Sequence, residues 1–177
     1  MQFTDPTKIT NKIFGKRAKK LIKMGEMIFT RDPTKYHLLG LGPCLGIYIY
    51  NEKRKNYFMA HTTAPYQGEK TVEHPEKGLF RKNAKFTDMA IKVMVGRLKR
   101  RGNRRVDLKC KIVGGGKMFN DDSDLGWRNV LSARKTLKRE RIELIGEDVG
   151  NRTSLAILNF FPDGKMRIRK KHQKYII

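Results

Sequence analysis

The chain has 177 residues, of which 38% are hydrophobic and 32% charged, so it is long enough to form one domain with a proper core. No segment is apolar over the length that spans a bilayer, and the first residues lack the apolar stretch of a secretory signal, which together predict a cytoplasmic protein. The formal net charge of +23 predicts attraction to a polyanion: nucleic acid, an anionic membrane surface or an acidic protein.

This positive charge is spread along the chain, in GKRAKKLIK, LKRRGNRR, RKTLKRER and RIRKKHQK. Spread charge is more typical of solvated helix faces than of one reading surface, and no zinc-finger, homeodomain or RNP signature is present. The two cysteines lie far apart in sequence, which predicts no disulfide framework. The four histidines are scattered, so we predict no metal site. We also predict no cofactor and, because those binding motifs are absent, no specific nucleic-acid partner.

Residues 1–24 are predicted to be a basic N-terminal arm. Its apolar residues can share one helical face, with lysines and arginine elsewhere. Such a segment can lie on an anionic membrane surface, although it more often packs on its own domain. Residues 25–30 are predicted to form the first short strand, closed by the Asp32-Pro33 turn signal.

The next stretch, LLGLGPCLGIYIYNEKRKNYFMAH, predicts a β-hairpin, and we expect the rest of the chain to be organised around it. A glycine-punctuated turn precedes Cys44, and the second strand ends on His61. Folding near Lys53 makes opposed residue numbers sum to about 106, so that Leu45 faces His61 and Cys44 meets His61 at the open end. The register is uncertain by one residue, and this parity decides whether the two side chains share a face or point to opposite faces.

A thiol beside an imidazole is a candidate pair of nucleophile and base. The residue types alone leave a second interpretation open. Free cysteines are usually small buried hydrophobes, and Cys44 fits that description. His61 after an apolar run is equally compatible with a structural histidine.

Beyond this hairpin, residues 66–83 are polar and rich in glycine and proline, which predicts a long loop of the kind that often acts as a lid or substrate grip. Thr87 is predicted to cap a helix over residues 88–100, with Gly102 as its stop. Its apolar stripe is Ala90, Val93, Met94 and Leu98.

The alternation of Val106, Leu108, Cys110 and Ile112 predicts a half-buried strand with Cys110 in the core. The glycines at 114–116 lack the spacing of a phosphate loop, so we expect them to form a tight turn.

A second helix is predicted over residues 126–139, with a stripe that includes Trp127, and the acidic residues at 121–124 suit its N-terminal dipole better than a metal. The strand at 142–145 and the hairpin of 154–161 with 165–169 complete the domain.

These elements predict a single mixed α/β domain with much antiparallel pairing. We assign residues 1–24 to the arm, 25–170 to the domain, and 171–177 to a loose basic tail.

Six motifs in this order, GEMIFTRDP, LGLGPC, FMAHTTAP, KIVGGGKMF, LGWRNV and GEDVGN, followed by KMRIRK, resemble the CheD family of chemoreceptor glutamine deamidases. The resemblance implies an α/β/β layered fold and a thiol hydrolase that converts receptor glutamine side chains to glutamate. It implies that Cys44 is the nucleophile and His61 the base. It also implies methyl-accepting chemoreceptors as substrate, receptor methyl esters as a further substrate, and a CheC-like phosphatase as partner.

Two positions depart from the family pattern. Leu38 stands where the family usually has a threonine of the site, and Pro43 stands where it commonly has serine. Leu38 can make no hydrogen bond, and Pro43 has no N–H. These departures keep one alternative open, a catalytically weakened binding module for CheC or receptors. The positive charge alone leaves another, a nucleic-acid-binding protein. The backbone N–H groups of the turn at 42–44 are the hypothetical oxyanion donors.

Overall fold

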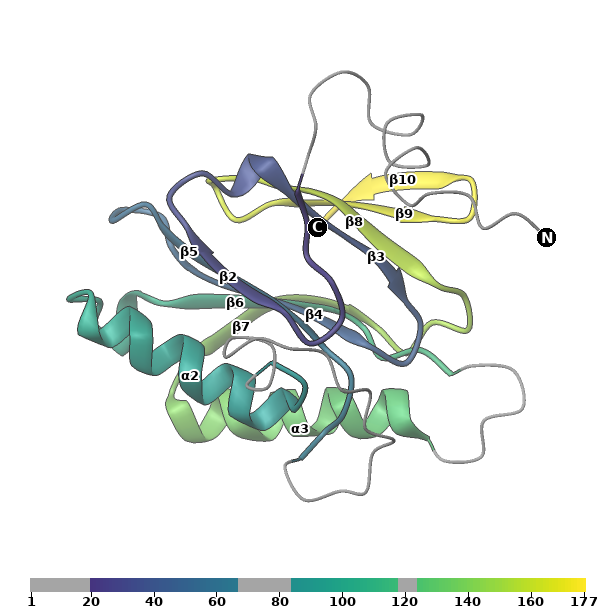
Figure 1. Ribbon diagram of the computed structural model, residues 1–177, viewed down its shortest axis with the longest axis horizontal. Helices are drawn as coiled ribbons and strands as arrows, with labels where there is room; N and C mark the ends of the chain where they lie inside the picture. Colours follow the sequence, from purple (N-terminus) through teal and green to yellow (C-terminus); the bar gives the residue numbers. More distant parts are fainter. Residues whose placement is uncertain (1–19, 67–83, 118–123) are drawn as a thin grey trace.

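The computed structural model describes residues 20–66, 84–117 and 124–177 of the chain. In this part the chain forms three layers: a pair of helices, a central five-stranded sheet, and a second five-stranded sheet (Figure 1). One apolar core lies between the helices and the central sheet, and another lies between the two sheets. The predicted α/β fold class, with its α/β/β layers and antiparallel pairing, is confirmed.

The central sheet has the order β2-β5-β4-β6-β7, with β6 and β7 parallel and the other neighbours antiparallel. Its strands are β2 (Met27–Thr30), β4 (Leu45–Asn51), β5 (Asn56–Thr62), β6 (Lys109–Gly114) and β7 (Glu143–Val149). Every residue of β4 and β5 is buried, because these strands have the helices on one face and the second sheet on the other.

The second sheet has the order β1-β3-β8-β9-β10, with β1 and β3 parallel. Its strands are β1 (Lys20–Leu21), β3 (Tyr36–Leu41), β8 (Leu155–Phe160), β9 (Met166–Lys170) and β10 (Gln173–Ile176). The hairpin of β8 and β9 confirms the one predicted from the sequence. Strand β3 was not predicted, since its glycine suggested a turn.

Successive side chains of β4 point to opposite layers. Ile47 and Ile49 belong to the core beneath the helices, whereas Tyr48 and Tyr50 belong to the core between the sheets. The hydroxyl of Tyr48 donates to Phe161 O at 2.9 Å, so the buried phenol is satisfied. This alternation decides which layer each side chain of the hairpin faces.

The helix layer consists of α2 (Thr87–Arg100) and α3 (Leu125–Glu140). The first helix buries Ala90, Met94 and Leu98 as predicted, and Gly102 follows its end with φ +77°. The predicted cap at Thr87 is wrong: the N-cap is Phe86, without a side-chain cap bond. The hydroxyl of Thr87 is instead 2.8 Å from that of Thr62, inside the core.

Two predictions about apolar residues are also wrong. Val106 is 81% exposed in a 3-10 turn, so the strand with Cys110 in its core starts only at Lys109. Trp127 is 43% exposed, because the buried face of α3 is formed by smaller side chains such as Val130 and Ala133.

Both chain ends of the described part join the second sheet. The prediction of a loose tail at 171–177 is wrong, because β10 pairs with β9 and the Tyr175 hydroxyl bonds the carboxylate of Asp148. Of the predicted arm, residues 1–19 lie outside the described residues, as does most of the loop at 66–83. The described end of the arm packs on the domain: β1 pairs with β3, and Ile22 is fully buried.

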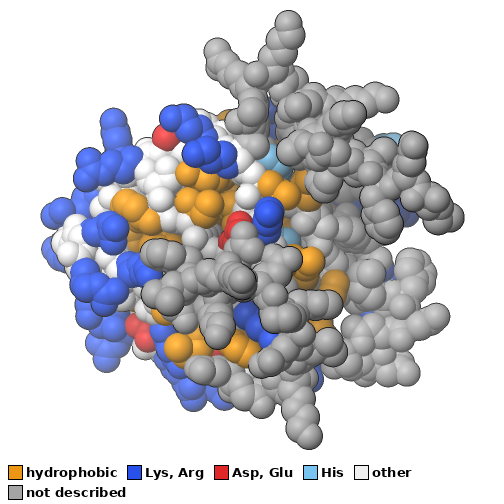
Figure 2. Space-filling view, in the orientation of Figure 1, with side chains coloured by type: hydrophobic (Ala, Val, Ile, Leu, Met, Phe, Trp, Pro, Cys, Tyr) orange, Lys and Arg blue, Asp and Glu red, His pale blue; other side chains and the backbone are white. Residues whose placement is uncertain are grey.

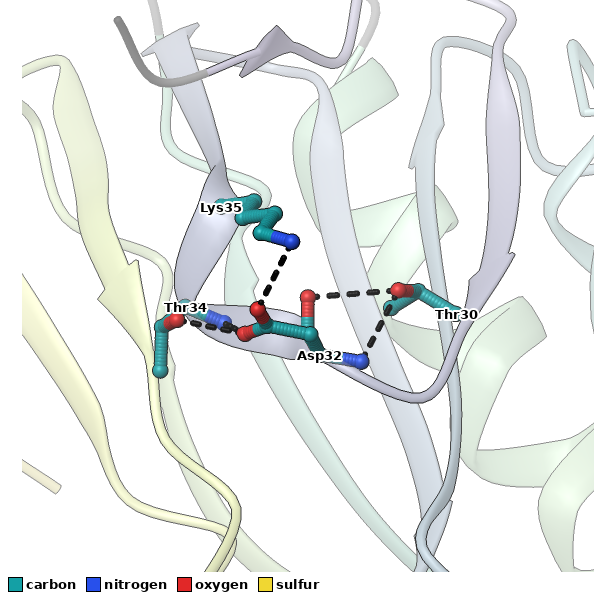
Figure 3. A network of polar contacts seen from close by, with 4 residues as sticks. All are labelled: Thr30, Asp32, Thr34 and Lys35. Carbon is teal, nitrogen blue, oxygen red and sulfur yellow. Dashed lines mark hydrogen bonds and ion pairs between the residues drawn. The ribbon is translucent and has the colours of Figure 1, made fainter. Parts of the chain in front are cut away.

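The chain crosses from the central sheet to the second sheet through the turn that the sequence predicted at Asp32-Pro33 (Figure 3). The carboxylate of Asp32 accepts a bond from the backbone N–H of Thr34 at 3.2 Å and pairs with Lys35 at 3.1 Å. The hydroxyl of Thr30 accepts from the Asp32 N–H at 3.0 Å. Hydrogen bonding by Thr34 lowers the pKa of Asp32, so the carboxylate caps the turn as an anion.

Helix α3 starts so close to the residues after β6 that its second residue has to be glycine. A Cβ on Gly126 would lie 2.3 Å from Gly116 O, whereas a Cβ on Gly96 of α2 would have only Arg100 Nη1 within reach, at 4.0 Å. We expect Gly126→Ala to lower the free energy of unfolding by about 1–3 kcal/mol through overpacking. Gly96→Ala should raise it by roughly 0.5–1 kcal/mol through helix propensity. Urea unfolding of both variants tests this, and equal midpoints would contradict the close approach.

Candidate active site

The pairing of β4 with β5 brings Cys44 and His61 to the same face. Paired residue numbers sum to 107, with Gly46 opposite His61 and Leu45 opposite Thr62. The predicted pairing of Leu45 with His61 is wrong by one residue, because four residues, 52–55, separate the last pair of the ladder. A hairpin loop with an even number of residues makes the numbers of paired residues add up to an odd number.

This register puts both side chains between the two sheets. Cys44 lies two residues before Gly46, in the cluster that contains Tyr48. His61 lies two residues after Met59 of the same cluster. Cys44 and His61 are thus diagonal neighbours on one face. The backbones of such diagonal neighbours are about 7–8 Å apart, which is within reach of long side chains. The structure therefore places the two residues that the sequence singled out on the same face of the central sheet.

His61 is held by the segment at 22–26. Its backbone N–H donates to Glu26 O at 3.0 Å, and its carbonyl accepts from Gly25 N at 2.8 Å. Its Nδ1 lies 3.3 Å from Ile22 O. A carbonyl oxygen only accepts, so Nδ1 carries the proton and Nε2 carries the lone pair.

Nε2 of His61 has no hydrogen-bond partner within the described residues. The imidazole is almost fully buried, and this burial lowers the pKa of His61 to about 4, against the smaller opposing effects of the Ile22 bond and Glu26. The ring is therefore neutral near pH 7. A neutral imidazole with an unused lone pair is competent to remove a proton.

Cys44 is a free cysteine that is only 8% exposed. Burial raises the pKa of the Cys44 thiol to about 11, and its own backbone N–H opposes this more weakly. The thiol is therefore protonated near pH 7, and it would have to lose its proton to act as a nucleophile. Its sulfur lies 4.0 Å from the sulfur of Met24, which is itself 66% exposed.

The turn that carries Cys44 is held by the glycines after β6. Gly115 N donates to Cys44 O at 2.8 Å, and Gly116 N donates to Gly42 O at 2.7 Å. Gly114 has φ +113°, and a Cβ there would lie 2.3 Å from Cys44 O. Residues 115–117 follow the strand without a regular turn, and the glycines are required because the two backbones approach closely.

Asn129 of α3 touches the same turn from the other layer. Its Nδ2 lies 2.8 Å from Pro43 O and 3.4 Å from Thr63 O. Sequence reasoning missed this residue, as it missed Ile22 and Met24. The only available signal was the position of Asn129 inside the LGWRNV motif.

The hypothetical oxyanion donors in the turn at 42–44 are fewer than expected. The Gly42 N–H already donates to Gly40 O at 3.0 Å, and Pro43 has no N–H. The N–H of Cys44 is the donor that this turn has left. Leu38 is fully buried beside the pair, with Cδ2 3.4 Å from where a Cβ on Gly46 would lie. His37 is buried too, and strand alternation points it away from Leu38.

Within the described residues, no group of three or more histidine, cysteine or acidic side chains is placed to hold a metal ion. No helix in the same residues is long and apolar enough to cross a membrane.

The depressed pKa of His61 links folding stability to pH. The ordinary value of 6.5 falls to about 4 in the folded protein, so the unfolded chain binds more protons between these values. Stability is therefore complete above about pH 6.5 and falls by about 3 kcal/mol as the pH drops towards 4. Asparagine does not titrate, so we expect the free energy of unfolding of His61→Asn to lose this part of its dependence on pH. His172→Asn, at an exposed turn, is the control, and identical slopes in both variants would contradict the assignment.

Comparison with known proteins identifies the family. The CheD family profile, described as CheD chemotactic sensory transduction, matches residues 72–170. Three similar proteins were compared. The "Probable chemoreceptor glutamine deamidase CheD" of Clostridium botulinum (strain Eklund 17B / Type B) is 31% identical over 84% of this chain and 91% of its own length. The "Probable chemoreceptor glutamine deamidase CheD 1" of Methanosarcina acetivorans is 33% identical over 78% and 83%. The "Chemoreceptor glutamine deamidase CheD" of Thermotoga maritima is 33% identical over 86% and 92%.

Among solved structures, the "hypothetical protein YfiH" of Bacillus licheniformis aligns with 72% of this chain and 51% of its own at 14% identity and a TM-score of 0.42, too distant to inform the site. The family profile begins after His61, but an alignment over 78% of the 177 residues necessarily includes the segment from Cys44 to His61. From the profile and these relatives, the chain belongs to the CheD family.

Proposed function

We propose that this protein is a chemoreceptor glutamine deamidase in which Cys44 is the nucleophile and His61 the general base. The names of the relatives support the reaction and the substrate. The observation that carries the residue assignment is the unpartnered Nε2 of His61, which faces the same space between the sheets as the Cys44 thiol. In the proposed division of the chain, residues 25–170 form the deamidase domain, and residues 20–24 complete it by holding His61.

In the first proposed step, Nε2 of His61 takes the proton from Cys44 as the sulfur attacks the carboxamide carbon of a glutamine side chain. The C=O double bond becomes a tetrahedral oxyanion, which accepts from the Cys44 N–H. The imidazolium then gives its proton to the amide nitrogen, the C–N bond breaks, and ammonia leaves. The product of this step is a thioester between Cys44 and the side chain.

In the second step, the neutral His61 removes a proton from water, and the resulting hydroxide attacks the thioester carbon. The C–S bond breaks, the sulfur takes the proton from the imidazolium, and the new carboxylic acid loses its remaining proton to solvent as the glutamate side chain leaves the site. Both steps return His61 to the neutral state that burial favours. No metal or cofactor enters either step.

The proposed substrate is a methyl-accepting chemoreceptor, and the proposed partner is a CheC-like phosphatase. We accordingly propose that the reaction takes place in the cytoplasm, next to the anionic membrane leaflet. Lysine and arginine side chains gather along the left side of the view in Figure 2, with few acidic side chains among them. Such a surface suits acidic receptor helices and peripheral contact with an anionic membrane.

Intact-mass analysis of a receptor cytoplasmic fragment tests the proposal. Incubation with the wild-type protein should add about 1 dalton for each glutamine converted to glutamate, and Cys44→Ala should abolish the gain because no nucleophile remains. Cys110→Ala, which removes the fully buried second cysteine, should retain it. An unchanged mass for several matched receptors would refute the deamidase proposal.

A second candidate function is a binding module for CheC or receptors without turnover. The observation that favours it is Leu38, an aliphatic side chain of β3 in the core between the sheets, which faces Gly46 of the central sheet. The implied family threonine would offer a hydroxyl there to orient His61. Binding of CheC together with absent deamidation would support this candidate.

Leu38→Thr separates the two functions. For an active deamidase, we expect kcat to change by less than about tenfold. The variant should also lose roughly 2–3 kcal/mol of stability through the cavity and the buried hydroxyl. Deamidation assays and urea unfolding measure both effects. Turnover that appears only in Leu38→Thr would identify the natural chain as the silent module.

A further inference from the structure

The β4–β5 ladder stops short of the nucleophile. Its last pair is Leu45 with Thr62, and Pro43 has no N–H with which to extend the pairing. Cys44 therefore lies one residue beyond the rungs that fix His61 in place. Something other than this ladder has to set the distance between the thiol and the imidazole.

The side chain of Asn129 spans this gap. It is fully buried, and its Nδ2 donates to Pro43 O at 2.8 Å and to Thr63 O at 3.4 Å. Pro43 immediately precedes Cys44, and Thr63 follows His61 by two residues. One amide group thus contacts both chain segments just beyond the last pair of the ladder, one carbonyl on each segment.

The chemistry of its partners fixes the orientation of this amide. Both oxygens that face Nδ2 belong to backbone carbonyls, which only accept hydrogen bonds. On the other side, Thr87 Oγ1 lies 3.4 Å from Asn129 Oδ1 and 2.8 Å from Thr62 Oγ1. Asn129 is therefore held by a hydroxyl pair that leads back to the second strand of the ladder.

We propose that Asn129 is a positioning residue that acts as an additional rung between the Cys44 turn and the end of the His61 strand. It touches neither the thiol nor the imidazole. Its role is to fix the separation of these groups, since a misplacement of about 1 Å can cost around a hundredfold in rate. This inference rests on the proposed Cys44–His61 pair.

Ser132 supplies a matched control on the same helix. It is also fully buried, and its hydroxyl donates to a backbone carbonyl, that of Pro65, at 2.6 Å. Pro65 lies downstream of the His61 strand, as Thr63 does, but Ser132 makes no bond to the turn of Cys44 in the described contacts. Asn129→Ala and Ser132→Ala therefore both remove a buried donor from α3, and only the first removes the bridge.

The test is the pH dependence of Cys44 alkylation by iodoacetamide, followed by mass analysis of the labelled peptide. It needs no receptor. In the wild type, neutral His61 should assist the reaction and give a nearly pH-independent rate from about pH 5 to 9, between the two perturbed pKa values. His61→Asn is the reference without a base. Its rate should follow the thiolate alone and rise about tenfold per pH unit.

We expect Asn129→Ala to lower the alkylation rate in the pH-independent range (the plateau) by about a hundredfold, so that its pH profile approaches that of His61→Asn. Ser132→Ala should keep the wild-type rate in this range. Thr87→Val, which retains the Nδ2 bridge but frees its other end, should show the same change to a smaller extent. It provides the measurement if Asn129→Ala does not fold. A plateau that survives in every folded variant, or that is lost equally in Ser132→Ala, would overturn the proposal.

The same outcomes separate this inference from the proposed function. A normal plateau without receptor deamidation would refute the function and leave the positioning role intact. A wild-type profile identical to that of His61→Asn would overturn the positioning role, because no coupled pair would exist. With an active enzyme, Asn129→Ala should lower kcat by about a hundredfold and leave KM within a few-fold, as expected for a loss felt in the transition state.

Discussion

The register of β4 against β5 is the constraint on which the rest of this structure depends. Both strands are buried on both faces, so a shift of one residue would exchange the side chains of the two cores. In the observed register, the tyrosines of β4 fill the space between the sheets, its isoleucines lie beneath the helices, and Gly46 leaves room opposite His61 for the second sheet. Fold and site geometry follow from the same alignment.

Much of the fold could be predicted from the sequence, which also supplied the two residues of the proposed site. Periodicity located both helices and the last hairpin, and the ordered motifs singled out Cys44 and His61 as candidates. The register could not be read, because the hairpin loop had no sharp turn signal and one residue more or less reverses the facing. The supports of the site were hidden for another reason. Asn129 bonds a carbonyl 86 residues away, and His61 bonds one 39 residues away, and backbone acceptors leave no pattern in side-chain types.

Burial shifts the pKa values of His61 and Cys44 in opposite directions. It makes the imidazole a weaker base and the thiol a weaker acid, so both are neutral in the resting protein. The lowered basicity has a use, because an imidazole that stays unprotonated keeps its lone pair available over a wide pH range. The raised thiol pKa keeps the thiolate fraction low near pH 7, so that reaction of the sulfur requires a base to take its proton. Reaction then depends on geometry more than on the acidity of either group.

The glycines around the Cys44 turn set a limit on sequence variation. Added Cβ atoms would lie 2.3 Å from Cys44 O at Gly114, 2.4 Å from Val130 at Gly115 and 1.9 Å from Asn151 O at Gly116. Three segments that are far apart in the chain are thus in close backbone contact: residues 42–44, residues 114–116 and the start of α3. Native contacts of such long sequence separation form late in folding, since each closes a large loop. Catalytic competence should therefore appear only with the final tertiary fold, and a polypeptide released before α3 is complete would be chemically inert.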